Sequence, residues 1–206
     1  MRQDNLSIII SSPSGAGKTT VCNLLVQKIP KLKFSVSHTT RQPRPNEKDG
    51  VDYFFISQEE FQKRIEQGYF LEWAKVYDNF YGTANETVGA LKKSGNDLLL
   101  DLDVQGAKTL KDSNYSGIFI FLLPPSLKEL RNRLKNRGTE DDNIIEQRLE
   151  VGRKEIAQYP LYDYVVVNSD VEESVRNIIA IMQAERCRSH RYVPTSKDIE
   201  NLLNKK

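Results

Sequence analysis

The sequence has little cysteine and tryptophan, no long apolar run and almost no excess of charge. Its 206 residues include two cysteines and one tryptophan, and the formal net charge is +2. Two cysteines give no disulfide framework, so we expect a reducing compartment. Such a small net charge offers no argument for nucleic-acid binding. With 38% hydrophobic and 28% charged residues, the composition excludes collagen-like, disordered and membrane-spanning proteins.

The first apolar run, 6–10, is too short for the hydrophobic region of a signal peptide. It is interrupted by Ser7 and leads into glycines instead of a cleavage site. We therefore expect a cytoplasmic protein that has no contact with a membrane. The chain shows no internal repeat, and its length suits one α/β domain of ordinary size.

Short apolar runs alternate with helical patterns along the chain. Runs such as 8–10 and 165–167 lack polar alternation, which is typical of parallel strands covered on both faces. The βαβα order favours a doubly wound parallel sheet. The strands we expect are Leu6–Ile10, Phe34–Ser37, Asp97–Val104, Ile118–Leu123 and Tyr164–Val167.

Helix starts are indicated by a small polar residue followed three positions later by glutamate. This pattern begins at Ser57, Thr83, Ser126 and Asp170, and we expect a further terminal helix beyond Arg186. Cys22 is expected in the core, and both histidines, His38 and His190, at the surface.

Two stretches, 38–56 and 135–148, break this rhythm. The first is polar, with two arginines and two prolines, and the second is dense in charge. Long loops in a compact domain usually bind ligands or act as lids. We expect both stretches to leave the central sheet and fold over its edge.

The most specific motif is Ser-Pro-Ser-Gly-Ala-Gly-Lys-Thr at 12–19, between an expected strand and an expected helix. It matches the phosphate-binding pattern G-x-x-x-x-G-K-[ST] except at Ser12, which is tolerable if its backbone avoids the left-handed region. Lys18 would then reach the β- and γ-phosphates, and the Thr19 hydroxyl would face Mg²⁺. The alternative is a chance Gly/Ser-rich turn. The ATP-binding residues expected here are Ser12, Pro13, Ser14, Gly15, Ala16, Gly17, Lys18, Thr19 and Thr20.

A carboxylate, Asp101, ends the apolar strand that starts at 97. At the carboxyl edge of a parallel sheet this is the position of a Mg²⁺ ligand, with water completing the contact. Asp103 projects to the same side of an extended strand. The alternative is that Asp101 caps the helix beginning near Gln105.

The side that accepts the phosphoryl group is richer in arginine and tyrosine. Arg41 and Arg44 lie in a proline-stiffened loop, and with Tyr53 and Tyr81 they could hold a phosphate dianion. Glu72 stands among apolar neighbours, where a carboxylate can accept the two parallel N–H bonds of guanine. Taken singly, each of these residues can be explained as a solvated charge or a core aromatic, and for Glu72 alone this explanation is favoured.

Together these motifs resemble the guanylate kinases. The resemblance covers about 6–185 and rests on the segments 12–19, 34–44, 50–55, 70–73, 81–83 and 137–140, in the family's order and spacing. It implies an α/β fold, a P-loop NTPase-type doubly wound parallel sheet with a GMP-binding insertion and a lid insertion. It also implies phosphoryl transfer from ATP to GMP with Mg²⁺ as cofactor.

The resemblance assigns roles to particular residues. Catalysis would use Lys18, Arg137 and Arg148, with Asn168 near the adenine and Mg²⁺ near Thr19 and Asp101. Arg133, one helical turn from Arg137, either assists or lies on an ordinary exposed face. The GMP-binding residues implied are Ser37, Arg41, Arg44, Tyr53, Glu72, Tyr81, Gly82, Thr83 and Asp103.

The chain is expected to form one domain, 1–206. Its core would comprise about 1–36, 83–134 and 149–187, with a GMP-binding subdomain at about 37–82, a lid at about 135–148 and a tail at 188–206. The expected partners are ATP and GMP and no nucleic acid. Whether dGMP also serves, and whether the chain is a monomer or a homodimer, stays open.

Two rival functions are a kinase for a phosphorylated sugar and a kinase-derived module that binds phosphopeptides. The first has no need of a guanine-binding carboxylate such as Glu72. The second typically has a degraded phosphate loop, whereas this chain retains Lys18 and Thr19. Turnover on GMP compared with a ribose phosphate would discriminate among these functions.

Overall fold

The computed structural model describes residues 2–3, 5–136, 142–193, 199, 201 and 203. Its centre is a five-stranded, all-parallel sheet with the strand order β10–β9–β2–β8–β3. These strands are β2 (Ser7–Ser11), β3 (Leu32–Phe34), β8 (Asp97–Asp101), β9 (Ile118–Leu123) and β10 (Tyr164–Val167). The predicted doubly wound parallel sheet is confirmed.

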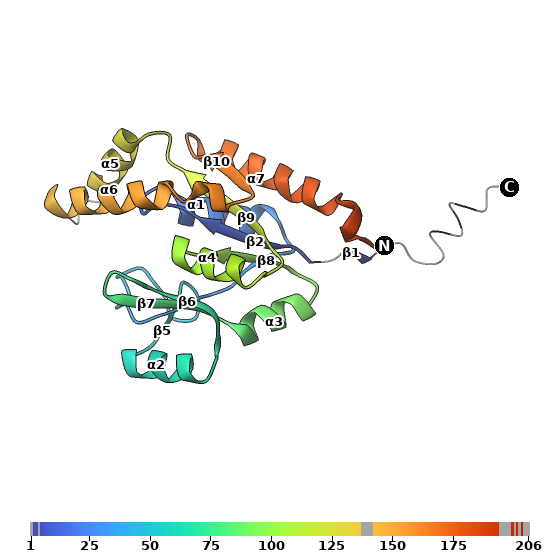
Figure 1. Cartoon of the computed structure of the whole chain (residues 1–206), viewed down its shortest axis with the longest axis horizontal. Helices are drawn as coiled ribbons and strands as arrows, with labels where there is room; N and C mark the ends of the chain where they lie inside the picture. Colours follow the sequence, from blue (N-terminus) through green and yellow to red (C-terminus); the bar gives the residue numbers. More distant parts are fainter. Residues whose placement is uncertain are drawn as a thin grey trace.

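Helices cover both faces of this sheet. In Figure 1, α1 (Lys18–Lys28) and α7 (Val171–Arg186) lie on one face, and α3 (Asn85–Lys93) and α4 (Val104–Asp112) on the other. The first pair buries its apolar side chains with those of β2 and β9, Cys22 included, as expected. The second pair packs against Ile9, Leu98 and Leu100.

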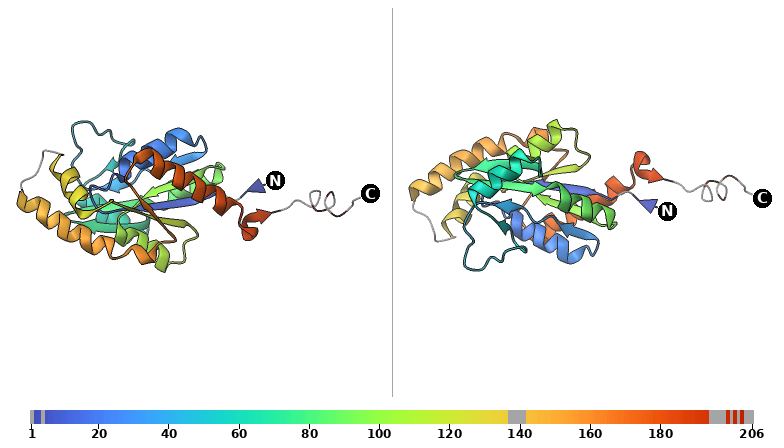
Figure 2. Two further views of the ribbon diagram at one scale, coloured as in Figure 1. Left: turned by 90° about the horizontal axis from the view of Figure 1, so that it is seen from above. Right: turned by 90° about the horizontal axis from the view of Figure 1, so that it is seen from below.

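Two further helices stand at one end of the sheet. α5 (Leu127–Lys135) and α6 (Asp142–Ile156) pack through Leu130, Leu134, Ile145 and Leu149, and a short helix, η1 (Tyr159–Leu161), follows. Both views in Figure 2 place this pair at the opposite end of the molecule from the paired terminal strands. The described part of the stretch 135–148 is therefore largely the first half of α6.

The stretch between β3 and α3 forms a second, four-stranded sheet with the order β5–β4–β7–β6. Its strands are β4 (His38–Thr39), β5 (Phe54–Phe55), β6 (Phe70–Val76) and β7 (Asn79–Ala84), with α2 (Gln58–Glu66) beside them. The Phe61 ring of α2 stacks on Phe70 and Phe80 and anchors that helix on the sheet. The sequence patterns predicted an insertion here but not this sheet.

Strand β1 (Arg2–Gln3) pairs antiparallel with β11 (Tyr192–Val193), which follows a short helix, η2 (Ser189–Arg191). The expected terminal helix does not follow directly after Arg186, because the chain forms η2 and then pairs with β1 up to residue 193. Further along the tail, the described residues 199, 201 and 203 are helical. Within the described residues, no helix combines the length and the apolarity that a membrane crossing requires.

Three other expectations need correction. The strand expected at 34–37 is 32–34, where Leu32 is buried and Lys33 exposed, as suits a strand at the sheet edge. The strand that starts at Asp97 ends at Asp101 instead of Val104, because Val104 is already the first residue of α4. His38 is buried, not exposed, with its ring stacked on Phe54, and burial lowers its pKa to about 4.

Candidate active site

A cavity of about 250 Å³ lies between the phosphate-binding loop and the second sheet. It combines residues from both motif groups that the sequence singled out. The expected residues that line it are Ser12, Pro13, Ser14, Gly15, Gly17, Lys18, Thr19, Thr20, Ser37, Tyr53, Glu72, Tyr81, Gly82, Asp101 and Asp103. Val76, Leu102 and Glu155 also line it and were not expected.

The phosphate-binding loop joins β2 to α1 through two glycines in left-handed conformations. Gly15 has φ 92° and Gly17 has φ 96°, which side-chain-bearing residues rarely adopt. The described non-glycine residues with positive φ are Tyr77 and Asn114, so Ser12 meets the condition under which it can replace glycine. The loop thus has the backbone geometry that the motif requires.

Asn168 and Arg133, which do not line the cavity, hold the phosphate-binding loop by hydrogen bonds to its backbone. The Asn168 side-chain amide donates to the Ala16 carbonyl at 2.7 Å, and Arg133 donates to the same carbonyl at 3.1 Å. Arg133 also donates to the Asn168 carbonyl at 3.1 Å. Asn168 is buried, with its own oxygen accepting from Ser174 at 2.9 Å. Asn168 and Arg133 therefore support the phosphate-binding loop. The sequence suggests either a catalytic or an ordinary surface role for Arg133, and this supporting role is neither.

The Lys18 ammonium group forms an ion pair with Asp101 and donates to the Leu102 carbonyl at 2.9 Å. Burial by itself would lower the pKa of Lys18, but attraction to Asp101 outweighs it and the pKa is raised. Lys18 is therefore charged and held at the end of β8. Asp101 does not cap α4, because Asp103 accepts the bond from the Gly106 N–H at 2.9 Å.

Glu72 lies on β6 at the other end of the cavity. It is 5% exposed, and its carboxyl accepts a 2.6 Å hydrogen bond from the Thr83 hydroxyl. Burial, helped by the negative charge of Asp103, raises the pKa of Glu72 to about 7. Thr83 was expected to cap α3; its hydroxyl instead binds Glu72, and Ala84 stands at that helix start. The carboxyl also lies against Gly106, where any Cβ would overlap it.

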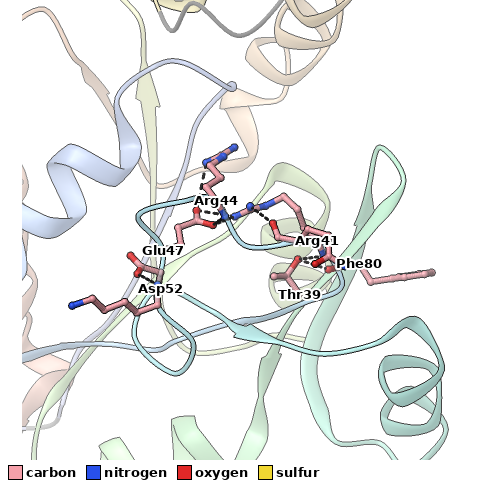
Figure 3. Close-up of polar contacts among 8 residues, drawn as sticks. Thr39, Arg41, Arg44, Glu47, Asp52 and Phe80 are labelled. Carbon is pink, nitrogen blue, oxygen red and sulfur yellow. Dashed lines mark hydrogen bonds and ion pairs between the residues drawn. The ribbon is translucent and has the colours of Figure 1, made fainter.

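The expected phosphate-binding arginines lie beside the cavity, on the loop between β4 and β5. Figure 3 shows the Glu47 carboxyl between them. Arg41 donates to both Glu47 oxygens, at 2.8 and 2.9 Å, and the Arg44 backbone N–H donates to Glu47 at 2.8 Å. The Arg41 guanidinium also lies 5.5 Å from the centre of the Tyr53 ring. Arg41 is thus aimed beside a cavity-lining tyrosine, whereas the Arg44 side chain is 65% exposed.

Of the two expected lid arginines, Arg148 is among the described residues and Arg137 is not. Arg148 lies on α6, and its guanidinium is 5.9 Å from the centre of the Tyr77 ring at the β6–β7 turn. Arg137 lies outside the described residues. The expected residues that do not line the cavity are Ala16, Arg41, Arg44, Thr83, Arg148 and Asn168.

Sequence reasoning missed two acidic residues. Glu47 carries a weak signal, because it follows Arg41 and Arg44 in the same short loop. Glu155 carries none, since it belongs to an ordinary charged helix and meets the cavity only through the packing of α6. Burial raises its pKa to about 7.

A parallel sheet, a phosphate-binding loop and a second sheet that faces it across a cavity define a P-loop kinase with a small-molecule acceptor. The guanylate kinase family model matches residues 4–185. The guanylate kinase of Caldanaerobacter subterraneus subsp. tengcongensis is 50% identical over 191 residues, covering 93% of each chain. That of Clostridioides difficile is 47% identical over 187 residues, covering 91% of each.

A solved structure leads to the same family. The crystal structure of guanylate kinase from Anaplasma phagocytophilum has a TM-score of 0.79 and 33% sequence identity, covering 100% of this chain and 98% of that one. The chain belongs to the guanylate kinase family, and it is a nucleoside monophosphate kinase. Its reaction is the ATP-dependent phosphorylation of GMP to GDP.

Proposed function

We propose that the two ends of the cavity divide the reaction ATP + GMP = ADP + GDP between them. The phosphate-binding loop takes the triphosphate, and the pocket around Glu72 takes the guanine base. The observation that carries this proposal is a carboxyl group buried at the far end of a cavity that begins at Lys18. An ionised carboxylate there can accept N–H bonds from guanine, with Ser37, Gly82, Thr83 and Asp103 around it.

The phosphate of GMP is the nucleophile. One of its oxygens forms the new bond to the γ-phosphorus of ATP while the bond to the β,γ-bridging oxygen breaks, and ADP leaves. Because a phosphate dianion is already nucleophilic, this step requires positioning and charge neutralisation and no dedicated base. Arg41, Arg44, Tyr53 and Tyr81 would position the GMP phosphate. Lys18, Arg137 and Arg148 would neutralise the transferring group.

Thr19 and Asp101 fit a Mg²⁺ ion that binds together with ATP. Both line the cavity and offer oxygen atoms, and Mg²⁺ is commonly held by one or two protein oxygens, substrate phosphates and water. The described residues contain no group of three or more acidic, His or Cys side chains that would form a cage by themselves. The ion would supply further neutralisation of phosphate charge.

The remaining expectations are kept as proposals. They comprise the division into core, GMP-binding subdomain (37–82) and lid (135–148), a cytoplasmic location, and function without nucleic acid as a monomer or a homodimer. On the ATP side, Asn168 is proposed to act by holding Ala16, as well as through the expected adenine contact.

The test is an ATP-dependent phosphorylation screen over GMP, dGMP, AMP, CMP, UMP and ribose phosphate. We expect GMP to exceed the non-guanine acceptors by at least about a hundredfold, since a site built for hydrogen bonds rejects analogues that lack them. Comparable turnover of AMP or ribose phosphate would contradict the proposed guanine pocket. The dGMP rate settles the open preference.

A further inference from the structure

The charge of the cavity lining is unusual for a site that binds two phosphate-bearing anions. Among the described residues, four acids line it, Glu72, Asp101, Asp103 and Glu155, and Lys18 is the only base among them. Taken by itself, this lining would repel anionic substrates if every one of these carboxyl groups were ionised. Each acid therefore needs a reason to be there.

Three of the acids have such a reason. Asp101 is paired with Lys18. Asp103 caps α4 through the Gly106 N–H. Glu72 accepts from Thr83 in the proposed guanine pocket. Glu155 alone has no assigned task, although it lies at the phosphate end of the cavity.

Glu155 is brought to the cavity by the packing of α6 on the phosphate-binding loop. Gly152, one turn earlier, lies so close to the loop that a Cβ there would be 3.6 Å from the Pro13 Cβ. Glu155 lines the cavity together with Ser14, Lys18 and Asp103. Its carboxyl group interacts electrostatically with the Ser14 backbone N–H, the Asp103 carboxyl, the Lys18 ammonium group and the Tyr162 hydroxyl. Arg148 lies two helical turns before Glu155 on the same helix.

We propose that Glu155 is a positioning residue of the ATP half: its carboxyl group holds the end of α6 against the phosphate-binding loop at Ser14, and its charge state sets the repulsion that the arriving triphosphate meets. The inference rests on the proposed division of the cavity. Burial is the main cause that raises the pKa of Glu155 to about 7, with Asp103 adding to it and Lys18 and the Ser14 N–H opposing it. A neutral Glu155 accepts from Ser14 without repelling the nucleotide, and an ionised one repels it.

The test is the pH profile of kcat/KM for ATP at saturating GMP, between about pH 6 and pH 8. In the wild type we expect this value to fall about fivefold more across the range than in Glu155→Gln, which keeps an acceptor oxygen but carries no charge. Because ATP itself titrates identically in all assays, the ratio of variant to wild type isolates Glu155. Relative to Glu155→Gln, Glu155→Leu, which loses the acceptor as well, should raise KM for ATP at every pH and leave KM for GMP near normal.

Glu150→Gln is the matched control, since Glu150 is an exposed acid on the same helix, and its profile should follow the wild type. A measurement without any variant is the proton count on ATP binding, from calorimetry in two buffers of different ionisation enthalpy. Above about pH 7 the wild type should take up protons, because the triphosphate favours the neutral carboxyl.

Three results would overturn the proposal: parallel profiles for Glu155→Gln and the wild type, no proton uptake, or a raised Mg²⁺ requirement in Glu155→Gln, which would make Glu155 a metal ligand. Failure of the wild type to use GMP in the acceptor screen would refute the proposed function instead, so the two failures are distinguishable.

Discussion

At the scale of single residues, the site depends on carboxyl groups whose neighbours set their charge. Asp101 forms an ion pair with Lys18, whereas burial favours the neutral form of Glu72. Glu47 is ionised: burial alone would raise its pKa, but bonds from Arg41 and Arg44 lower it. Acids of one chemical type thus serve different tasks within one cleft.

For Glu72 we predict a pH-dependent effect on GMP alone. Because its pKa is about 7, the carboxylate needed to accept from guanine forms as the pH rises through 7, and KM for GMP should fall there. Glu72→Gln should raise KM for GMP by about tenfold to a hundredfold and remove this pH dependence. Steady-state kinetics with each substrate varied in turn measure both effects. Equal losses for ATP and GMP would mean that Glu72 is structural.

For Glu47 we predict that removal loosens Arg41. In Glu47→Ala the guanidinium loses both carboxyl oxygens, and KM for GMP should rise by about fivefold with kcat little changed. Asp52→Ala is the control on the same loop, since Asp52 accepts from the Lys48 backbone N–H. A lower KM for GMP in Glu47→Ala would instead show that Glu47 competes with the phosphate.

At the scale of elements, apolar runs and capping patterns predicted the core well. The runs 118–123 and 164–167 are strands with those bounds, and Ser57, Ser126 and Asp170 each accept the expected cap bond. The pattern at Thr83 failed because a long-range bond to Glu72 outcompetes the local cap. In the second sheet, β4 and β5 were missed because they are two-residue strands, too short to show periodicity. β6 and β7 are long enough to show it, with 7 and 6 residues, and were missed as well.

The site itself was predictable where a local motif carries it. The phosphate loop needs its glycines and lysine consecutively, so 12–19 could be read directly. Glu155 and the loop-supporting role of Arg133 come from helices that pack on this loop from distant parts of the sequence. No single-chain pattern encodes such contacts, because the same residues suit an exposed helix face.

The first turn of α4 yields a prediction about Gly106. A methyl group there would overlap the Glu72 carboxyl, so Gly106→Ala should push that side chain aside and raise KM for GMP by about tenfold. Because alanine favours helix over glycine by about 1 kcal/mol, the fold should not be weakened. Gly89→Ala in α3, where a Cβ meets nothing within 4 Å, is the control. Denaturation measures the effect of each variant on stability, and steady-state kinetics measure its effect on KM for GMP. Unchanged GMP kinetics in Gly106→Ala would contradict the contact between Gly106 and Glu72.

At the scale of the whole molecule, the cleft joins two sheets that the chain builds in separate segments. Only tertiary packing sets the distance between Lys18 and Glu72, and the loss of solvent around both is a property of the assembled fold. Burial of such groups has a cost in stability, which ligands can offset by binding to the folded state.

This cost should be visible as pH-dependent stability. The pKa of Glu72 rises from its usual 4.5 to about 7 on folding, so its contribution is fully present below about pH 4.5 and is lost as the pH rises through 7. Relative to Glu72→Gln, the ligand-free wild type should lose on the order of 3 kcal/mol of unfolding free energy across this window. Urea denaturation at several pH values measures the difference. A difference independent of pH would contradict the assigned burial.

The pairing of β1 with β11 has a mechanical consequence. Arg2 pairs with Val193 and Gln3 with Tyr192, so a force that separates the two ends would break this ladder one rung at a time, as a zipper opens. Tension would therefore peel the short ladder before it reaches the central sheet. A molecule tethered through handles at 2 and 193 should show a low-force opening step and keep its catalytic cleft intact through it.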